Sequence, residues 1–476
     1  MKQYIEILRK KFNSYKIDGY VVPKNDEFFT EYSKINRLKI ISNFSGSAGL
    51  AIILKNKNYL FTDGRYTIQS EVESGRYFKI FGFEKLINCN LFKNLTLGID
   101  PKLFTNSQTK KFFLKNNKIK HINVNLIDEI KKQKEKKNIP FFSLNKNIVG
   151  ESVRSKIAKI SKYLKNKKSD YIFISAPENV AWILNIRGGD GPNSPIPNSR
   201  LIVSKSKKIL LISKKEKCKK LIKNKIIKLN QLLDVSELPN KILKLKGKKF
   251  VIDDKSCSIF YENLINSKFK IVSREDPTYL LKAIKNRVEI NNMIKAHIVD
   301  GVALTKFIYW IKKTNKNKIN EVEAATKLER FRKMSKNFLY PSFDTIAGSG
   351  KNGAIVHYRA QKENCRNINK KDIFLCDSGG QYKYGTTDVT RTLCFSDQSK
   401  NIKNIFTKVL KGHIAVASTN INTDNIGKKI DKRARKFLKD SNLDYAHGTG
   451  HGVGFFLNVH EGPQSITNLN KVKIRP

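Results

Sequence analysis

Residues 374–392 constrain this chain most, because they place two aspartates on what the sequence predicts to be a tight antiparallel hairpin. A turn centred between Tyr382 and Lys383 would set Asp377 directly opposite Asp388. Directly opposed side chains on one face of a hairpin have Cβ atoms about 4.5–5.5 Å apart. Two carboxylates at that distance repel unless one is protonated, an arginine intervenes or a divalent cation lies between them.

The residues around the two aspartates favour the cation. Thr386, Thr387, Thr390 and Thr392 supply hydroxyls suited to a second shell around a hard cation, and Arg391 is a possible counter-charge. A polar surface hairpin with two solvated aspartates is the alternative. The hairpin alone leaves both interpretations open.

The composition bounds the class of protein. A chain of 476 residues with 39% hydrophobic residues predicts two to four globular domains. The net charge of +52, from 93 Lys and Arg against 41 Asp and Glu, would by itself suggest nucleic acid or an anionic membrane. The lysines extend from Lys10 to Lys473 and form no single basic arm. We therefore expect a general compositional drift and no specific nucleic-acid partner.

Cysteine spacing and hydropathy indicate the compartment. The six cysteines form no Cys-x-x-Cys pair, so we expect a reducing compartment. No uninterrupted apolar run reaches the roughly 18 residues that a membrane span needs, and residues 1–12 lack the apolar core of a signal peptide. We expect a cytoplasmic protein with no membrane partner.

Alternating strand-like and helix-like segments predict an α/β (α+β) chain of three domains, at 1–149, 150–282 and 283–476. The two successive α/β units suggest a duplication. A lysine-rich stretch at 131–137 is interpreted as a linker or a helix end. Short apolar runs predict strands at 19–23, 50–54, 171–175, 201–203 and 209–212. Longer periodic patterns predict helices at 152–164, 288–310, 402–417 and 425–439.

Three of the seven histidines, His447, His451 and His460, fall within fourteen consecutive residues. Four glycines between positions 448 and 454 make a helix there costly, at about 1 kcal/mol each relative to alanine. We therefore expect extended backbone. One of these histidines could ligate a metal, while the others hydrogen-bond a substrate or carry protons.

A further histidine, His357, follows the glycine-rich stretch 347–354 and is predicted at the end of a short apolar strand. A partly buried loop histidine is the alternative. His121, His297 and His413 are interpreted as ordinary core or surface residues.

Together these segments carry a family resemblance. The hairpin and segments 352–358 and 447–463 resemble the catalytic domain of the Xaa-Pro aminopeptidases (aminopeptidase P), M24 metallopeptidases with the pita-bread fold. Segments 43–49 and 62–66 resemble the first creatinase-like domain of the three-domain form, and 179–188 the second. The resemblance covers nearly the whole chain. It implies two creatinase-like N-terminal domains followed by an incomplete pita-bread catalytic domain.

The resemblance also implies a metal site. In this family two divalent cations, usually manganese, are held by two aspartates, one histidine and two glutamates. Carried over, Asp377 would chelate one metal, Asp388 would bridge both and His451 would bind the other. A metal-bridged hydroxide would then attack the carbonyl before proline.

The same resemblance implies the substrate contacts. His357 and His460 match substrate-contacting histidines that handle protons, and His447 would line the same pocket. Arg65 matches a substrate-binding arginine. The implied partners are peptides with proline at the second position and a second copy of the chain in a homodimer.

The sequence departs from the family after Glu461, beyond which it contains no acidic residue. The two glutamate ligands are therefore unmatched, and we expect a C-terminally truncated chain or fragment with an incomplete dinuclear site, the activity belonging to the full-length form. Two alternatives stay open: a prolidase on the same fold, restricted to dipeptides, and a non-catalytic pita-bread binding module.

Overall fold

The computed structural model describes residues 1–87, 89–132, 139–316 and 319–475. The chain divides into two compact units. Unit 1 comprises Met1–Lys146, Glu151–Pro192 and Ile196–Thr278, and unit 2 comprises Asn147–Gly150, Asn193–Pro195 and Tyr279–Pro476. Most of the predicted linker at 131–137 lies outside the described residues. Within the described residues, no helix combines the length and the apolar character that a membrane span requires.

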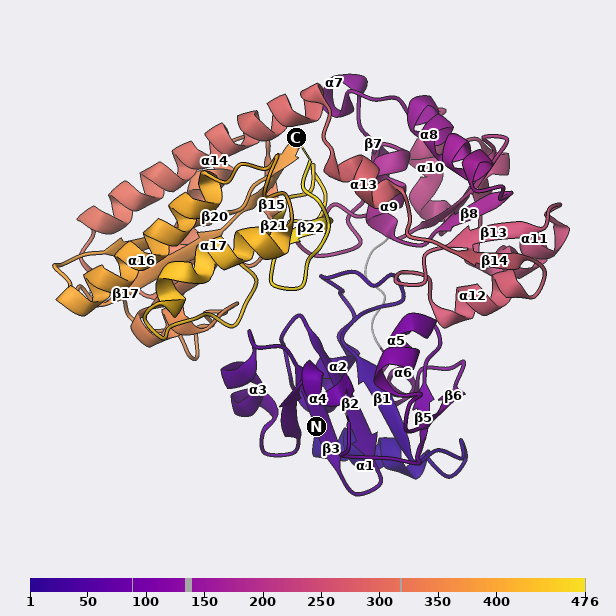
Figure 1. Ribbon diagram of the computed structural model, residues 1–476, viewed down its shortest axis with the longest axis horizontal. Coiled ribbons are helices and arrows are strands. Elements are labelled where there is room, and N and C mark those ends of the chain that lie inside the picture. Colours follow the sequence, from indigo (N-terminus) through magenta and orange to yellow (C-terminus); the bar gives the residue numbers. More distant parts are fainter. Residues whose placement is uncertain (88, 133–138, 317–318, 476) are drawn as a thin grey trace. The chain divides into compact units, whose positions relative to one another are not determined.

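The described part of unit 1 contains two six-stranded mixed sheets with the same topology (Figure 1). Their strand orders are β4-β3-β2-β1-β5-β6 and β12-β11-β10-β8-β13-β14. β1 lies antiparallel to β2 and parallel to β5, just as β8 lies antiparallel to β10 and parallel to β13. This repeated arrangement agrees with the duplication that the sequence suggests. The strands are β1 (Gly19–Pro23), β2 (Gly49–Leu54), β3 (Asn58–Thr62), β4 (Lys79–Gly82), β5 (Thr96–Ile99), β6 (Lys118–His121), β8 (Tyr171–Ile174), β10 (Arg200–Ser204), β11 (Ile209–Ile212), β12 (Leu232–Leu233), β13 (Lys249–Ile252) and β14 (Lys270–Ser273).

Helices and two short strands complete the part of the chain before residue 284. The short strands, β7 (Phe142–Ser143) and β9 (Ile186–Arg187), pair with each other. The helices are α1 (Lys2–Lys10), α2 (Arg37–Ser42), α3 (Thr67–Ser74), α4 (Phe83–Ile87), α5 (Asn106–Phe112), α6 (Leu126–Ile130), α7 (Lys146–Val149), α8 (Val153–Asn166), α9 (Pro177–Ile183), α10 (Lys215–Lys223), α11 (Leu238–Lys244), α12 (Ile259–Asn266) and α13 (Thr278–Ala283), with 3-10 turns η1 (Leu229–Gln231) and η2 (Val235–Glu237).

The apolar runs of the first sheet form strands because both faces of the sheet are buried. Successive residues of a strand point to opposite faces. Ala51 and Ile53 of β2 therefore join one core, and Leu50 and Ile52 join the other. A strand covered on both faces has no polar side, which is why the sequence shows a continuous apolar run there.

Unit 2 holds the segments that contain the predicted metal ligands. Two of its described sheets are three-stranded, in the orders β15-β18-β19 and β16-β17-β20, and β21 pairs with β22. The elements are α14 (Arg287–Lys313), α15 (Glu321–Lys333), β15 (Phe338–Pro341), β16 (Ile346–Ser349), η4 (Gly350–Ala354), β17 (Ile373–Ser378), β18 (Gly380–Tyr382), β19 (Gly385–Thr386), β20 (Val389–Cys394), α16 (Lys400–Ala417), α17 (Gly427–Lys439), β21 (Gly450–Gly452) and β22 (Glu461–Ile466).

Helices α14 and α15 cover one face of the β16-β17-β20 sheet. Phe307 of α14 and Leu328 of α15 share a core with Phe374 and Cys376 of β17. Since β17 alternates buried and half-buried residues, Asp377 points away from this core. The helices thus cover one face of β17, and Asp377 lies on the other.

The predicted register of the hairpin is wrong by two residues. Asp377 pairs with Thr390, and Tyr382 pairs with Gly385 across a turn at Lys383 and Tyr384. In this register Gly385 packs against α14, where an added Cβ would come within 2.8 Å of the Ala296 Cβ.

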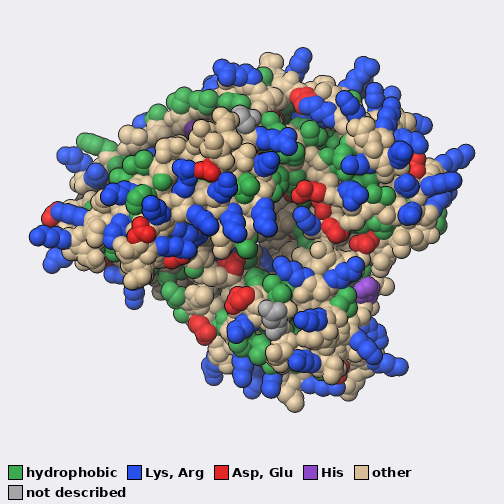
Figure 2. Space-filling view, in the orientation of Figure 1, with side chains coloured by type: hydrophobic (Ala, Val, Ile, Leu, Met, Phe, Trp, Pro, Cys, Tyr) green, Lys and Arg blue, Asp and Glu red, His purple; other side chains and the backbone are tan. Residues whose placement is uncertain are grey.

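The basic side chains are spread widely. Figure 2 shows Lys and Arg scattered over the visible surface, with no single basic patch. The compositional drift expected from the sequence stays a prediction.

Asp276 is a buried carboxyl in unit 1. It accepts hydrogen bonds from the Asn179 side chain, at 2.7 Å, and from the Thr278 amide, at 2.9 Å. Burial nevertheless raises the pKa of Asp276 to about 6, since low-dielectric surroundings disfavour the charged carboxylate.

This carboxyl should make the stability of unit 1 fall with rising pH. Its folded-state pKa lies above its unfolded value, so its stabilising contribution is complete below about pH 4 and is lost as pH rises through about 6. The free energy of unfolding should fall by about 3 kcal/mol over this range. Asp276→Asn should therefore gain about that much stability relative to the parent between pH 4 and pH 7.

Urea unfolding can measure this difference. The chain has two tryptophans, so a Trp310→Phe background leaves Trp182 of α9 as the reporter for unit 1. Glu275→Gln, at an exposed neighbouring position, serves as the control. A gain in Asp276→Asn that does not vary with pH would contradict the expected titration.

Candidate metal and substrate site

Asp377 lies on the open face of β17, in a half-buried position. Thr390, its partner across the sheet, donates a hydrogen bond to Asp377 Oδ1 at 2.7 Å. Burial raises the pKa of Asp377 to about 6; the Thr390 hydrogen bond lowers this pKa, and the charge of Asp388 raises it again. A cation at this position would favour the ionised carboxylate.

Asp388 and His451 face each other. The distance from His451 Nε2 to Asp388 Oδ2 is 3.3 Å. The other ring nitrogen, Nδ1, lies 2.8 Å from the Gly452 carbonyl oxygen, which requires a proton on Nδ1. In a neutral ring Nε2 then presents a lone pair to the carboxylate, so two acceptors oppose each other. A proton or a metal cation between them relieves that opposition, and backbone-oriented imidazoles of this kind are typical of metal ligands.

His460 joins this group. The rings of His451 and His460 meet edge to face, with centroids 4.3 Å apart. Both histidines lower the pKa of Asp377 through their charge, although burial dominates. The structure therefore brings together Asp377 and Asp388 of the hairpin with His451 and His460 of the segment 447–463.

His447 lies in a bend before β21, so of the glycine-rich segment predicted to be extended only Gly450–Gly452 form a strand; α17 supports this segment. Asp431 of α17 is buried, accepts hydrogen bonds from Arg435 Nε at 2.9 and 3.1 Å, and accepts one from Thr449 Oγ1 at 2.6 Å. Arg435 also donates to the His447 carbonyl oxygen at 2.6 Å. The backbone between His447 and His451 is thus tied to α17.

His357 lies in the loop after β16, and its predicted local structure is wrong. The residues before it form η4, a 3-10 turn, where a short apolar strand was predicted. Asn352 and Gly353 pack closely against Gly348, so this glycine-rich chain turns tightly and does not extend. His357 itself has a φ of 62°, in the left-handed region.

Arg65 belongs to unit 1, between β3 and α3. Its guanidinium donates to both carboxylate oxygens of Asp63, at 2.9 and 2.7 Å. Its predicted role toward substrate stays a prediction.

The side chains of Asp377, Asp388 and His451 offer the kinds of donor atom that divalent cations bind. Carboxylate oxygens with a single imidazole suit a hard cation better than a thiolate-type zinc site. Among the residues that the structure describes, no group of three His, Cys, Asp or Glu side chains has the spacing of a formed metal site. Of the predicted ligands, Asp388 and His451 lie 3.3 Å apart, and their roles as ligands stay predictions.

Comparison with known proteins identifies the family. Residues 291–476 match the model of metallopeptidase family M24, and residues 5–129 and 131–289 each match a creatinase/prolidase N-terminal domain. The chain is 36% identical to a probable Xaa-Pro aminopeptidase P of Laccaria bicolor, over 96% of this chain and 75% of the relative. It is 35% identical to Xaa-Pro aminopeptidase 1 of Dictyostelium discoideum, over 97% of this chain and 78% of that relative. The chain belongs to the Xaa-Pro aminopeptidase P family.

A solved structure supports the aminopeptidase P fold. X-prolyl aminopeptidase of Caenorhabditis elegans, described as a cytosolic enzyme with a di-nuclear active site, matches with a TM-score of 0.89 and 28% identity, over 98% of this chain and 82% of that one. Prolidase from Pyrococcus furiosus shares the fold over 66% of this chain, with a TM-score of 0.53. The fold is that of two creatinase-like N-terminal domains and a pita-bread M24 domain.

Sequence reasoning missed the supporting residues. Asp431, Arg435 and Glu461 hold the histidine segments; Glu461 is buried and pairs with Lys282 and Lys285. The i, i+4 spacing of Asp431 and Arg435 is a helical ion-pair signal. That spacing does not reveal the contact with Thr449.

Asp431→Asn should loosen the segment from His447 to His451. The substitution weakens one of the two carboxylate partners of Arg435, and Asp444 remains as the other, so we expect a cost of about 1–2 kcal/mol of unfolding free energy. Urea unfolding followed by Trp310 fluorescence, in a Trp182→Phe background, measures the change. Asp440→Asn, at an exposed position beyond α17, should alter stability by less than about 0.5 kcal/mol. Equal effects of the two variants would contradict the proposed support.

Proposed function

We propose that this protein is a metal-dependent aminopeptidase that hydrolyses the peptide bond between an N-terminal residue and a following proline. The Asp388–His451 pair carries the proposal most directly, because it opposes two acceptors at 3.3 Å beside a second aspartate. Membership of the Xaa-Pro aminopeptidase P family supplies the substrate class.

Asp377, Asp388 and His451 are the residues that would hold two divalent cations. Mn²⁺ is our proposed metal, on the basis of the hard oxygen donors. When bound, such cations supply Lewis acidity and lower the pKa of water toward neutrality. Asp377 lies on the face of β17 that points away from the core of unit 2, which supports its assignment as a ligand.

The histidines are proposed to handle protons and contact substrate. His460 lies against His451, so it can exchange a proton beside the ligands. His357 and His447 are assigned to the same pocket, and Arg65 of the first domain to substrate binding. An imidazole suits this work because its ordinary pKa lies near neutral pH.

Assembly and location complete the proposal. We assign domains to 1–149, 150–282 and 283–476, a homodimeric state and a cytoplasmic location. In the described structure Cys89, Cys218, Cys257, Cys365, Cys376 and Cys394 are all free thiols, which fits a reducing compartment. The C. elegans relative is described as cytosolic.

Peptide cleavage by the gene product, as the cell makes it and supplied with Mn²⁺, tests the activity. An Xaa-Pro-Xaa tripeptide should be cut after its first residue, and the same peptide with alanine in place of proline should not. Asp388→Ala should lower kcat/KM by more than about a hundredfold, since outer-shell partners alone contribute about 10–100-fold. Asp397→Ala, at an exposed position after β20, is the matched control. Faster cleavage of an Xaa-Pro dipeptide would favour a prolidase.

A further inference from the structure

Glu321 is the first residue of α15, and it is fully buried. Its Oε1 accepts hydrogen bonds from the Ser349 amide at 2.7 Å and from Asn352 Nδ2 at 3.1 Å. Its Oε2 accepts from the Tyr358 hydroxyl at 2.8 Å and from the Arg366 amide at 2.9 Å. A single buried carboxylate therefore ties α15 to four positions between residues 349 and 366.

Glu321 is not needed to cap its own helix. Asn320 accepts a hydrogen bond from the Glu323 amide, and the Glu323 carboxylate accepts one from the Asn320 amide. This reciprocal capping box satisfies the start of α15. The Glu321 carboxylate instead faces other segments, and the positive end of the helix dipole stabilises its charge.

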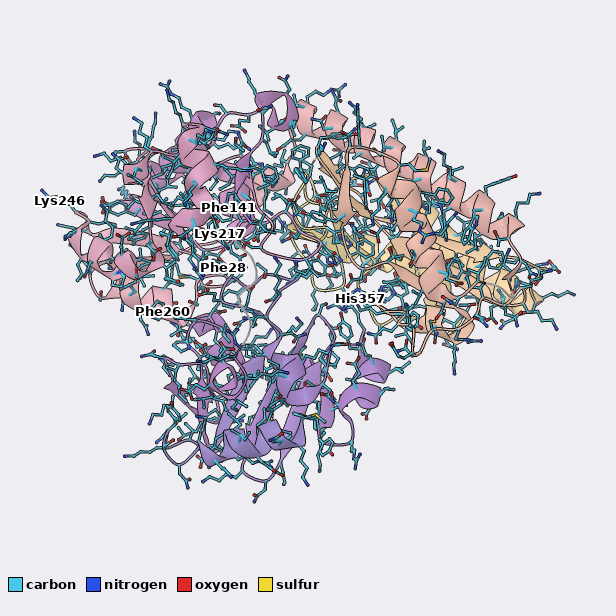
Figure 3. All side chains as sticks on the ribbon, turned by 180° about the vertical axis from the view of Figure 1, so that it is seen from behind. Phe28, Phe141, Lys217, Lys246, Phe260 and His357 are labelled. Carbon is cyan, nitrogen blue, oxygen red and sulfur yellow. The ribbon has the colours of Figure 1, made fainter. Side chains whose placement is uncertain are left out.

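Three of the donors to Glu321 flank His357 along the chain, and His357 is labelled in Figure 3. Ser349 ends β16, Asn352 lies in η4, and Tyr358 directly follows His357. Asn352 Nδ2 also lies 2.9 Å from the Tyr358 hydroxyl. These contacts hold the chain on both sides of the histidine.

The backbone at His357 requires this support. Its φ of 62° lies in the left-handed region, which costs roughly 1–2 kcal/mol for a residue with a Cβ. Such a conformation persists only where the surroundings over-determine it. β16 also pairs with β17, so that Ile346 lies opposite Asp377 and the loop is anchored to the strand that carries a predicted metal ligand.

We propose that Glu321 is a positioning residue for His357: its carboxylate fixes the loop from 349 to 358 and thereby the direction of the imidazole. The inference deepens the proposed aminopeptidase function, on which the catalytic meaning of His357 rests. Glu321 itself contacts no substrate in this proposal.

Substitutions at this position separate charge, shape and helix effects. Glu321→Gln keeps the volume but offers one acceptor oxygen where two are used, and its NH₂ group faces donors. Glu321→Asp keeps both oxygens but is one methylene shorter, so it should give partial rescue. Glu323→Gln alters the other glutamate of the same first turn and is the matched control.

Two readouts that need no catalysis test the proposal. In Glu321→Gln, hydrogen–deuterium exchange over residues 349–358 should become at least about tenfold faster, while exchange in β1 should not change. NMR of ¹³C-labelled histidine should show a displaced His357 signal with an altered pH titration; the chain has seven histidines, and His357→Gln assigns the signal. Glu321→Asp should give intermediate values, and Glu323→Gln should resemble the parent.

Several outcomes would overturn the proposal. The first is that Glu321→Gln leaves both the exchange rate of residues 349–358 and the His357 NMR signal unchanged. The second is that Glu323→Gln changes these two readouts as much as Glu321→Gln does. If Glu321→Gln does not fold, Glu321→Asp decides: faster exchange confined to residues 349–366 supports the proposal, and faster exchange throughout unit 2 refutes it. Normal peptide cleavage by His357→Ala would remove the catalytic role of His357 and leave the positioning result intact, so the two failures are distinguishable.

Discussion

The buried ion pair between Asp300 and Arg332 holds the catalytic part of unit 2 together. Arg332 of α15 donates to both carboxylate oxygens of Asp300 of α14, at 2.7 and 3.0 Å, and neither side chain is appreciably exposed. The same pair binds Tyr382 of β18 and Ser378 of β17. A buried pair is stable only when its remaining donors and acceptors are satisfied, so both helices are locked to the strand that places Asp377.

The two faces of β17 do different work. Phe374 and Cys376 pack against the helices, while Asp377 points to the open face. The packing of Phe374 and Cys376 fixes the backbone of β17, and therefore the position of Asp377 on the opposite face. Burial also keeps the Asp377 carboxyl away from bulk water, which raises its pKa and makes the position favourable for a positive partner. The same carboxylate would be an ordinary solvated acid on a flexible loop.

The sequence predicts elements whose signals are local. Apolar runs identify β1, β8 and β11, and helical periodicity identifies α14 and α16. The partners of Glu321 carry no such signal, because they lie 28–45 residues away along the chain. The left-handed backbone of His357 also depends on these distant contacts. The local apolar pattern before His357 does not reveal them, and it led to the wrong prediction of a strand. Long-range hydrogen bonds to a single buried carboxylate cannot be read from spacing.

The error in the hairpin register shows which property of a strand governs function. The turn is displaced by one residue, so each pairing moves by two, and Asp377 meets Thr390 where Asp388 was expected. Side chains on a strand alternate with a period of two, so this shift leaves both aspartates directed to the same face. Asp388 still raises the pKa of Asp377. A shift of one residue would have turned one aspartate toward Phe374 and the helices, where an unpaired charge is costly. The face on which a carboxylate lies therefore matters more to the site than the residue opposite it.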